Sequence, residues 1–193
     1  MKIPTNKLAI LCTAVCVTML AFTHNASATT LTIGDTYTLG YVYFGIPSGD
    51  QARQTYTNDL VGFYNSGCAS NTDCGTMNGQ DYFMVNGKPH FGASLPNATF
   101  VTNGTAQQTS ILVLSSYTYL FAKYDGPNAG SVVWYLGNLV GQTIDIPTTW
   151  GQYGLSGWTI FSGGGGVPDG GATVMLLGAA LGALGMARRF LKR

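Results

Sequence analysis

Short runs of hydrophobic and polar residues fill the middle of the chain, and Gly, Pro, Asn and Asp separate these runs. The runs are rich in β-branched and aromatic residues, and little of this part has the period of an amphipathic helix. This pattern predicts a series of strands. Their expected ranges are 30–33, 37–46, 55–64, 81–85, 98–102, 110–116, 117–125, 131–137, 142–147 and 157–162. The run at 55–64 is the weakest of them and also fits a short helix.

Turn-forming residues separate several of the predicted strands. Asn86-Gly87 and Asn103-Gly104 are pairs that accept positive φ in tight hairpins. The residues Asp-Gly-Pro-Asn at 125–128 join two strong runs, which predicts a hairpin. Many short strands at close spacing favour two packed antiparallel sheets. We therefore expect an all-β fold, an antiparallel β-sandwich of jelly-roll type, with a closed barrel as the alternative.

The first 28 residues have the pattern of a secretory signal peptide. Lys2 and Lys7 give a basic start, residues 8–22 are apolar, and Ala-Ser-Ala at 26–28 offers the small residues that signal peptidases accept. We expect cleavage after Ala28. A permanent amino-terminal anchor is the alternative, but the apolar run is short for a membrane span.

Cleavage would leave two of the four cysteines. Cys12 and Cys16 would leave with the signal peptide, and Cys68 and Cys74 would remain. Because paired cysteines in exported proteins usually form disulfides, we expect a Cys68–Cys74 bond. A zinc site is not expected, since His90 is the only histidine left and no second cysteine pair exists.

The charge of the predicted exported domain argues against nucleic-acid binding. Residues 29–166 contain three basic residues and seven aspartates, a formal charge of −4, and the whole chain has no glutamate. Binding to nucleic acid needs a basic surface that replaces counterions. The low charge and the abundant Thr, Ser, Asn, Gly and Tyr are instead typical of extracellular β proteins.

The end of the chain has the pattern of a membrane anchor. A glycine-rich tether covers residues 163–171, and residues 172–187 carry no charge. Arg188 and Arg189 follow and open a basic segment, 188–193, which predicts a transmembrane helix with its carboxyl end in the cytoplasm. This apolar segment is slightly short, but long basic side chains can reach the interface from its end.

These features in this order resemble the PEP-CTERM sorting signal in its VPD-type form. The resemblance implies that Val167, Pro168 and Asp169 are the recognition motif for exosortase, a membrane transpeptidase-like cysteine protease that removes the tail. Gly170 stands where serine is common in one variant. Residues 119–137 and 153–166 are similar to parts of other exported PEP-CTERM domains, which implies a β-sandwich and no particular activity.

Residues suited to catalysis or metal binding are few. A Ser-His-Asp set would depend on His90, and no G-x-S-x-G motif is present. Paired carboxylates for glycoside hydrolysis would have to come from aspartates, which mostly stand in turns. The segment 71–81 holds oxygen ligands that calcium prefers, without EF-hand spacing. We expect no catalytic residues, no metal and no cofactor.

Aromatic residues are plentiful, and most should build the core. The segment 148–158 is aromatic and loop-like, so it is the best candidate for an exposed patch that stacks on sugar rings.

The expected organisation is a signal peptide (1–28), a β-sandwich (29–162), a tether with the sorting motif (163–171), a transmembrane helix (172–187) and a basic tail (188–193). We expect a non-enzymatic structural or adhesive protein of the bacterial cell surface or polysaccharide matrix. Its expected partners are an exosortase-type enzyme, the membrane and an extracellular polysaccharide. The alternatives are a carbohydrate-binding module and a secreted polysaccharide hydrolase.

Overall fold

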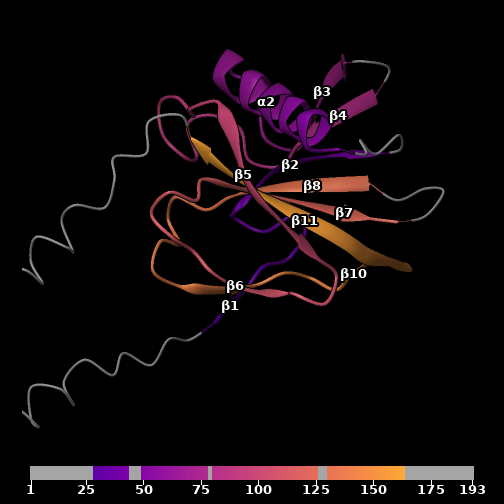
Figure 1. Ribbon diagram of the computed structural model, residues 1–193. Helices are drawn as coiled ribbons and strands as arrows, with labels where there is room; N and C mark the ends of the chain where they lie inside the picture. The colour runs from indigo at the N-terminus through magenta and orange to yellow at the C-terminus, as the bar shows by residue number, and fades with distance from the viewer. Residues whose placement is uncertain (1–27, 44–48, 78–79, 126–129, 164–193) are drawn as a thin grey trace, which may run out of the picture.

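The computed structural model describes residues 28–43, 49–77, 80–125 and 130–163 (Figure 1). These residues form a mostly β-structure that contains one helix. The elements are β1 (Thr29–Thr30), β2 (Thr38–Tyr43), α2 (Asp50–Ser66), β3 (Thr72–Met77), β4 (Gln80–Met84), β5 (Ala98–Thr105), β6 (Ser110–Leu112), β7 (Tyr119–Tyr124), β8 (Gly130–Tyr135), β9 (Thr143–Asp145), β10 (Thr149–Trp150) and β11 (Tyr153–Gly163).

A large antiparallel sheet has the strand order β10-β11-β7-β8-β2-β4-β3. Its longest strand, β11, pairs with β7 along one edge and with β10 and then β5 along the other. The expected hairpin across residues 125–128 is confirmed, because β7 pairs antiparallel with β8. A second sheet of three strands has the order β1-β9-β6, in which β1 and β9 are parallel.

The central strands of the large sheet are buried on both faces. In β7, Leu120 packs into one core and Phe121 into the other, and in β8 Val132 and Val133 divide in the same way. Figure 1 shows α2 above the large sheet and the small sheet with β1 and β6 below it. The expected mostly β fold with a large antiparallel sheet is thus confirmed, whereas the second sheet is mixed, because β1 runs parallel to β9. The jelly-roll arrangement is wrong, because a helix covers the other face and the small sheet has only three strands.

The strand expected at 55–64 is wrong, because these residues belong to α2. Tyr56, Leu60 and Tyr64 are spaced by four residues, so they fall on one helical face, and all three are buried against the sheet. The helix ends at Ser66, and Gly67, whose φ is 89°, forms its left-handed cap. The N–H of Gly67 bonds to the carbonyl of Tyr64 and that of Cys68 to Phe63, which is a Schellman motif.

The pair Asn103-Gly104 does not form the expected turn and instead lies inside β5. Gly104 pairs with Trp158 of β11, and the indole ring covers the glycine. A Cβ at residue 104 would lie 1.9 Å from Trp158 Cζ2, so only glycine fits below the ring. The indole N–H donates to the carbonyl of Gln108, which closes the loop after β5 over the same side chain.

Two strands, β3 and β10, were not expected, and β11 begins four residues before its expected range. The segment 148–158 is therefore not a loop: it forms β10, a two-residue turn with Gly151 at φ 60°, and the start of β11. A glycine with positive φ at this position is typical of tight hairpin turns.

The predicted signal peptide (1–27 of its 28 residues), the sorting motif and the basic tail lie outside the described residues. The apolar segment 172–187 lies outside them too. In the part of the chain that the structure describes, no helix has the length and apolar character needed to cross a membrane.

Candidate functional site

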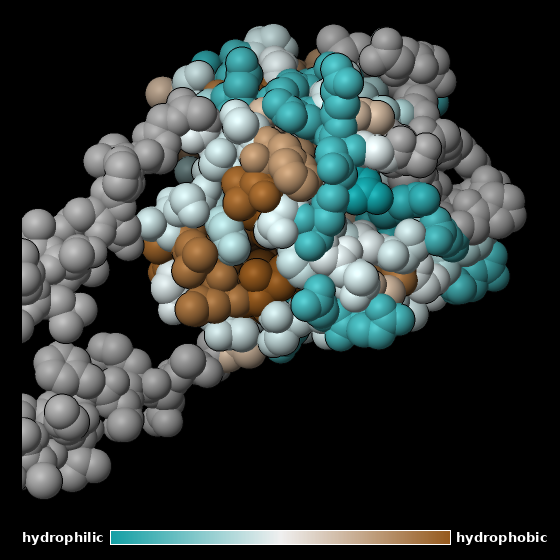
Figure 2. Space-filling model, in the orientation of Figure 1, coloured by the Kyte–Doolittle hydropathy of each residue, from teal (hydrophilic) through white to brown (hydrophobic). Residues whose placement is uncertain are grey.

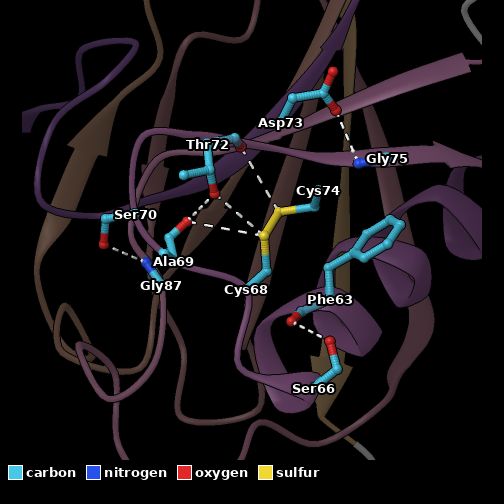
Figure 3. The surroundings of a disulfide bond; sticks show 10 residues. All are labelled: Phe63, Ser66, Cys68, Ala69, Ser70, Thr72, Asp73, Cys74, Gly75 and Gly87. Carbon is cyan, nitrogen blue, oxygen red and sulfur yellow. Dashed lines mark hydrogen bonds between the residues drawn. A yellow bond between two sulfur atoms is a disulfide. The ribbon is translucent and has the colours of Figure 1, made fainter.

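The expected Cys68–Cys74 disulfide is present, with the two Cα atoms 6.0 Å apart. It joins the residue that follows the cap of α2 to the edge strand β3. Figure 3 shows the Thr72 side chain inside the bridged loop, where its hydroxyl donates to the carbonyl of Ala69 at 2.6 Å. The bond therefore fastens the end of the helix to the edge of the large sheet.

The bridged loop also packs closely against the chain after β4. The N–H of Gly87 donates to the Ser70 hydroxyl at 2.7 Å, and the N–H of Asn71 donates to the carbonyl of Met84 at 2.8 Å. A Cβ at residue 87 would lie 2.4 Å from the carbonyl oxygen of Cys68. Glycine is needed here for close backbone approach rather than for the hairpin that the sequence pattern predicted.

His90 lies on the surface and contacts backbone rather than a nucleophile. Its Nε2 donates to the carbonyl of Thr36 at 2.8 Å, and its ring packs edge-on against Phe91 with centroids 4.6 Å apart. These contacts of the His90 ring include neither a serine nor an aspartate of the Ser-His-Asp set considered from the sequence.

Each of the seven aspartates in the described residues interacts with a donor close to it. Asp35 caps a turn by accepting from the N–H groups of Thr32, Tyr37 and Thr38. The other interactions are Asp50 with Asn103, Asp59 with Tyr82, Asp73 with the N–H of Gly75, Asp81 with Thr76, Asp125 with Lys123 and Asp145 with Ser110. Within the described ranges no three Asp, Glu, His or Cys side chains form a group that could hold a metal ion.

Buried tyrosines have strongly shifted acidities. Burial raises the pKa of Tyr82 above its ordinary value, and the hydrogen bond to Asp59 at 2.8 Å raises it further. Burial also raises the pKa of Tyr124, whose hydroxyl donates to the carbonyl of Pro147 at 2.8 Å, and that of Tyr119. The neutral phenol is favoured in each case, so these groups hold the fold together by hydrogen bonds and keep their protons well above neutral pH.

A cluster of aromatic rings brings together side chains from β2, β4 and β10, although β11, β7 and β8 lie between β10 and β2 in the large sheet. Tyr41 stacks on Phe83 with centroids 5.0 Å apart and an interplanar angle of 15°. Trp150 lies edge-on to Tyr41 at 5.4 Å and nearly parallel to Tyr43 at 6.0 Å. Tyr43 is 41 % exposed, and Tyr41, Phe83 and Trp150 are partly exposed. We call these four residues the aromatic cluster.

The aromatic cluster differs from the patch expected at 148–158. Trp150 belongs to it, but Trp158 is only 6 % exposed and packs over Gly104 in the core. Phe83 was missed by the sequence reading, since its run has no feature that separates it from core strands. Strand register supplies the missing information, because Tyr41 pairs directly with Phe83 across β2 and β4.

Ala28 is exposed and immediately precedes β1, so the predicted cleavage site stands at the start of the described fold.

The remaining predicted site residues are Val167, Pro168, Asp169, Arg188 and Arg189, which lie outside the described residues. No curated protein and no solved structure significantly matches the chain. Residues 166–190 match the VPDSG-CTERM motif, with Gly170 at the serine position, and this range includes all five residues. Such a motif implies export and a carboxyl-terminal membrane anchor before sorting. The carboxyl-terminal segment is thus a PEP-CTERM-type exosortase sorting signal.

Proposed function

We propose that this protein is a non-enzymatic component of the cell surface or extracellular matrix, released from its membrane anchor by an exosortase-type enzyme. The observation that carries the proposal is the VPDSG-CTERM motif at residues 166–190. The roles assigned to Val167, Pro168 and Asp169 in recognition, and the cleavage after Ala28, are parts of the same proposal.

The sorting step is tested by the double substitution Pro168→Ala and Asp169→Ala in a host that contains the enzyme. The full-length protein should then accumulate in the membrane fraction, while the wild type is released. Gly165→Ala, which changes the tether just outside the matched range, is the matched control and should be released normally. Mass spectrometry of the released wild type should locate both ends, with Thr29 first. Normal release of the double variant would contradict the proposed recognition residues.

The domain before the tether should fold by itself. Among the described residues, both cores draw their members from the range 31–161, and we expect them to bury their apolar surface without the tail. A chain of residues 29–163 should therefore give a cooperative unfolding transition and the near-ultraviolet circular dichroism of fixed aromatic rings. An unfolded product would show that the tail contributes to the core.

A second candidate function is binding of a matrix carbohydrate, which the aromatic cluster favours. Flat rings that share a face of a sheet offer apolar surface to the C–H faces of sugars, and the hydroxyls of Tyr41 and Tyr43, 3.2 Å apart, offer hydrogen bonds. Trp150→Ala should weaken retention of the protein in gels that contain the exopolysaccharide of its host. Tyr117→Ala, outside the cluster, is the control. Equal retention of the two variants and the wild type would contradict this function.

The rival function, hydrolysis of a matrix polymer, predicts new reducing ends when the protein is incubated with that polymer. The proposed non-enzymatic function predicts none. The aspartates support the non-enzymatic function, since the carboxylates of Asp35, Asp50, Asp73 and Asp81 already accept hydrogen bonds from nearby donors in the fold.

A further inference from the structure

Apolar side chains are exposed together at one end of the small sheet. Leu112 is 54 % exposed, Leu114 46 % and Val140 47 %. Leu112 and Leu114 also line an open hollow with Ile111, Tyr117 and Trp158. Figure 2 shows hydrophobic residues gathered around a hollow on the face that carries β6. We call Leu112, Leu114 and Val140 the apolar end.

Backbone hydrogen bonds hold the three residues in one place. The N–H of Val113 donates to the carbonyl of Gln142, and the N–H of Gly141 donates to the carbonyl of Val113, both at 2.9 Å. Val113 itself is buried in the core, so its neighbours at 112 and 114 point outward. The hydrogen-bonded backbone around the buried Val113 therefore keeps Leu112 and Leu114 at the surface on either side of it.

Both ends of the described domain lie beside the apolar end. At the start, the Thr29 hydroxyl donates to Gln142 Oε1 at 2.9 Å, two residues from Val140. At the finish, the N–H of Gly163 donates to the Thr118 hydroxyl at 2.6 Å. The residue before Thr118 is bonded through its N–H to the carbonyl of Leu114 at 2.9 Å. The chain thus leaves toward the tether from the same end of the fold that exposes the leucines.

The length and charge of the surrounding sequence fit a membrane surface. Residues 164–171 separate Gly163 from the apolar segment, and eight residues span at most about 28 Å. The segments 107–122 and 126–144, which contribute the apolar end, hold no charged residue. Exposed leucines and a tyrosine suit the lipid interface, and the Asp145 carboxylate on the neighbouring strand β9 accepts a hydrogen bond from the Ser110 hydroxyl.

We propose that, before sorting, the domain lies on the bilayer that holds its tail, with Leu112, Leu114 and Val140 inserted into the lipid interface. The proposal rests on the proposed anchoring by the tail. It assigns a lipid-binding surface to the folded domain, which the sorting motif by itself does not require. Release of the tail would leave only this weak contact, so the domain would then detach.

The test places a reporter on the apolar end of the anchored protein. The chain 29–193, with its native disulfide intact, carries Leu112→Cys labelled with an environment-sensitive nitrobenzoxadiazole dye. Gln51→Cys, at the exposed start of α2, is the matched control. Both are reconstituted into vesicles of phosphatidylethanolamine and phosphatidylglycerol, with or without lipids that carry a doxyl quencher near the headgroup. Flotation confirms that each labelled chain is anchored.

We expect the doxyl lipid to lower the emission at residue 112 at least twofold and to leave the emission at residue 51 unchanged. Adding Leu114→Ser should reduce the quenching at 112 without loss of folded circular dichroism. Equal emission with and without doxyl at residue 112 in floating protein would overturn the proposal while leaving anchoring intact. The dye at residue 112 could instead show a blue-shifted emission that doxyl lipid does not quench and that disappears when the protein is diluted in lipid. That result would overturn the proposal and show that the apolar end binds a second copy of the protein. Protein that fails to float would overturn both the anchoring and this proposal.

Discussion

Removing the disulfide offers a quantitative test of how the helix is fastened to the sheet. The bridge closes a loop with a sequence separation of 6. Chain-entropy theory gives a loop of this length a loss of about 7 cal/mol/K in the unfolded state, or about 2 kcal/mol at 25 °C. Because Cys68 and Cys74 are each only partly buried, replacing both with serine removes little apolar contact. The double variant should therefore lose about 2 kcal/mol of unfolding free energy and remain folded.

Urea denaturation of residues 29–163, followed by circular dichroism and aromatic fluorescence, measures this loss. The dependence of unfolding free energy on urea should also rise slightly, because the unfolded chain without the bridge exposes more surface. Wild-type protein treated with a reducing agent is the control and should match the double variant. A loss below about 0.5 kcal/mol would refute the entropic argument. A variant that is unfolded in buffer would show that the bridge holds the α2 end in place rather than restricting the unfolded chain.

Two further predictions concern the core. Gly104→Ala should cost about 1–3 kcal/mol of unfolding free energy, because its Cβ meets the Trp158 ring, and it should change tryptophan fluorescence. The control is Gly154→Ala on β11, the strand that pairs with β5; a Cβ there has open space around it, so stability should change by less than about 0.5 kcal/mol. Stability should fall as pH rises above the ordinary tyrosine pKa near 10, because the unfolded chain then releases phenolic protons that the folded chain keeps. Tyr124→Phe should flatten that fall in urea titrations between pH 9 and 11, and an unchanged slope would contradict the assigned burial effect.

Strand positions followed well from local sequence because the signal for them is local. The runs that became β7 and β8 are bounded by turn residues and filled with β-branched or aromatic side chains. Their arrangement did not follow, although one sign was present. In β7 the residues from Tyr119 to Ala122 are apolar without alternation, which is what a strand covered on both faces requires. In a two-sheet sandwich, one face of each sheet would be exposed to solvent.

The helix was misread because its composition favours strands. Thr55, Tyr56, Thr57, Val61 and Phe63 are β-branched or aromatic, yet the four-residue spacing of the buried side chains decides the element. Tertiary burial against the sheet outweighs the weak helical propensity of these residues. Short β3 and β10 were missed because they depend on partners: β10 has only two residues, which pair with the start of β11 across a glycine turn.

The sorting signal could be recognised from sequence since its parts are contiguous and ordered along the chain. The aromatic cluster and the apolar end could not, because each collects residues from strands that are distant in the sequence. Tyr41, Phe83 and Trp150 meet only through strand register, and Val140 reaches Leu114 through the hydrogen bonds around Val113.

The position of β11 also dictates when the domain can finish folding. This strand lies inside the large sheet, between β7 on one side and β5 and β10 on the other, yet it is the last strand in the part of the chain that the structure describes. During export the earlier strands can form hairpins, but β5 has no strand partner until residues 157–163 have crossed the membrane. Residues 164–193 follow at once, so closure of the sheet and arrival of the sorting signal at the membrane fall at the same stage of translocation. An exosortase can act only after the sorting signal has reached the membrane. By then β11 has already been exported and can pair with β5 and β7, so the released domain can be complete.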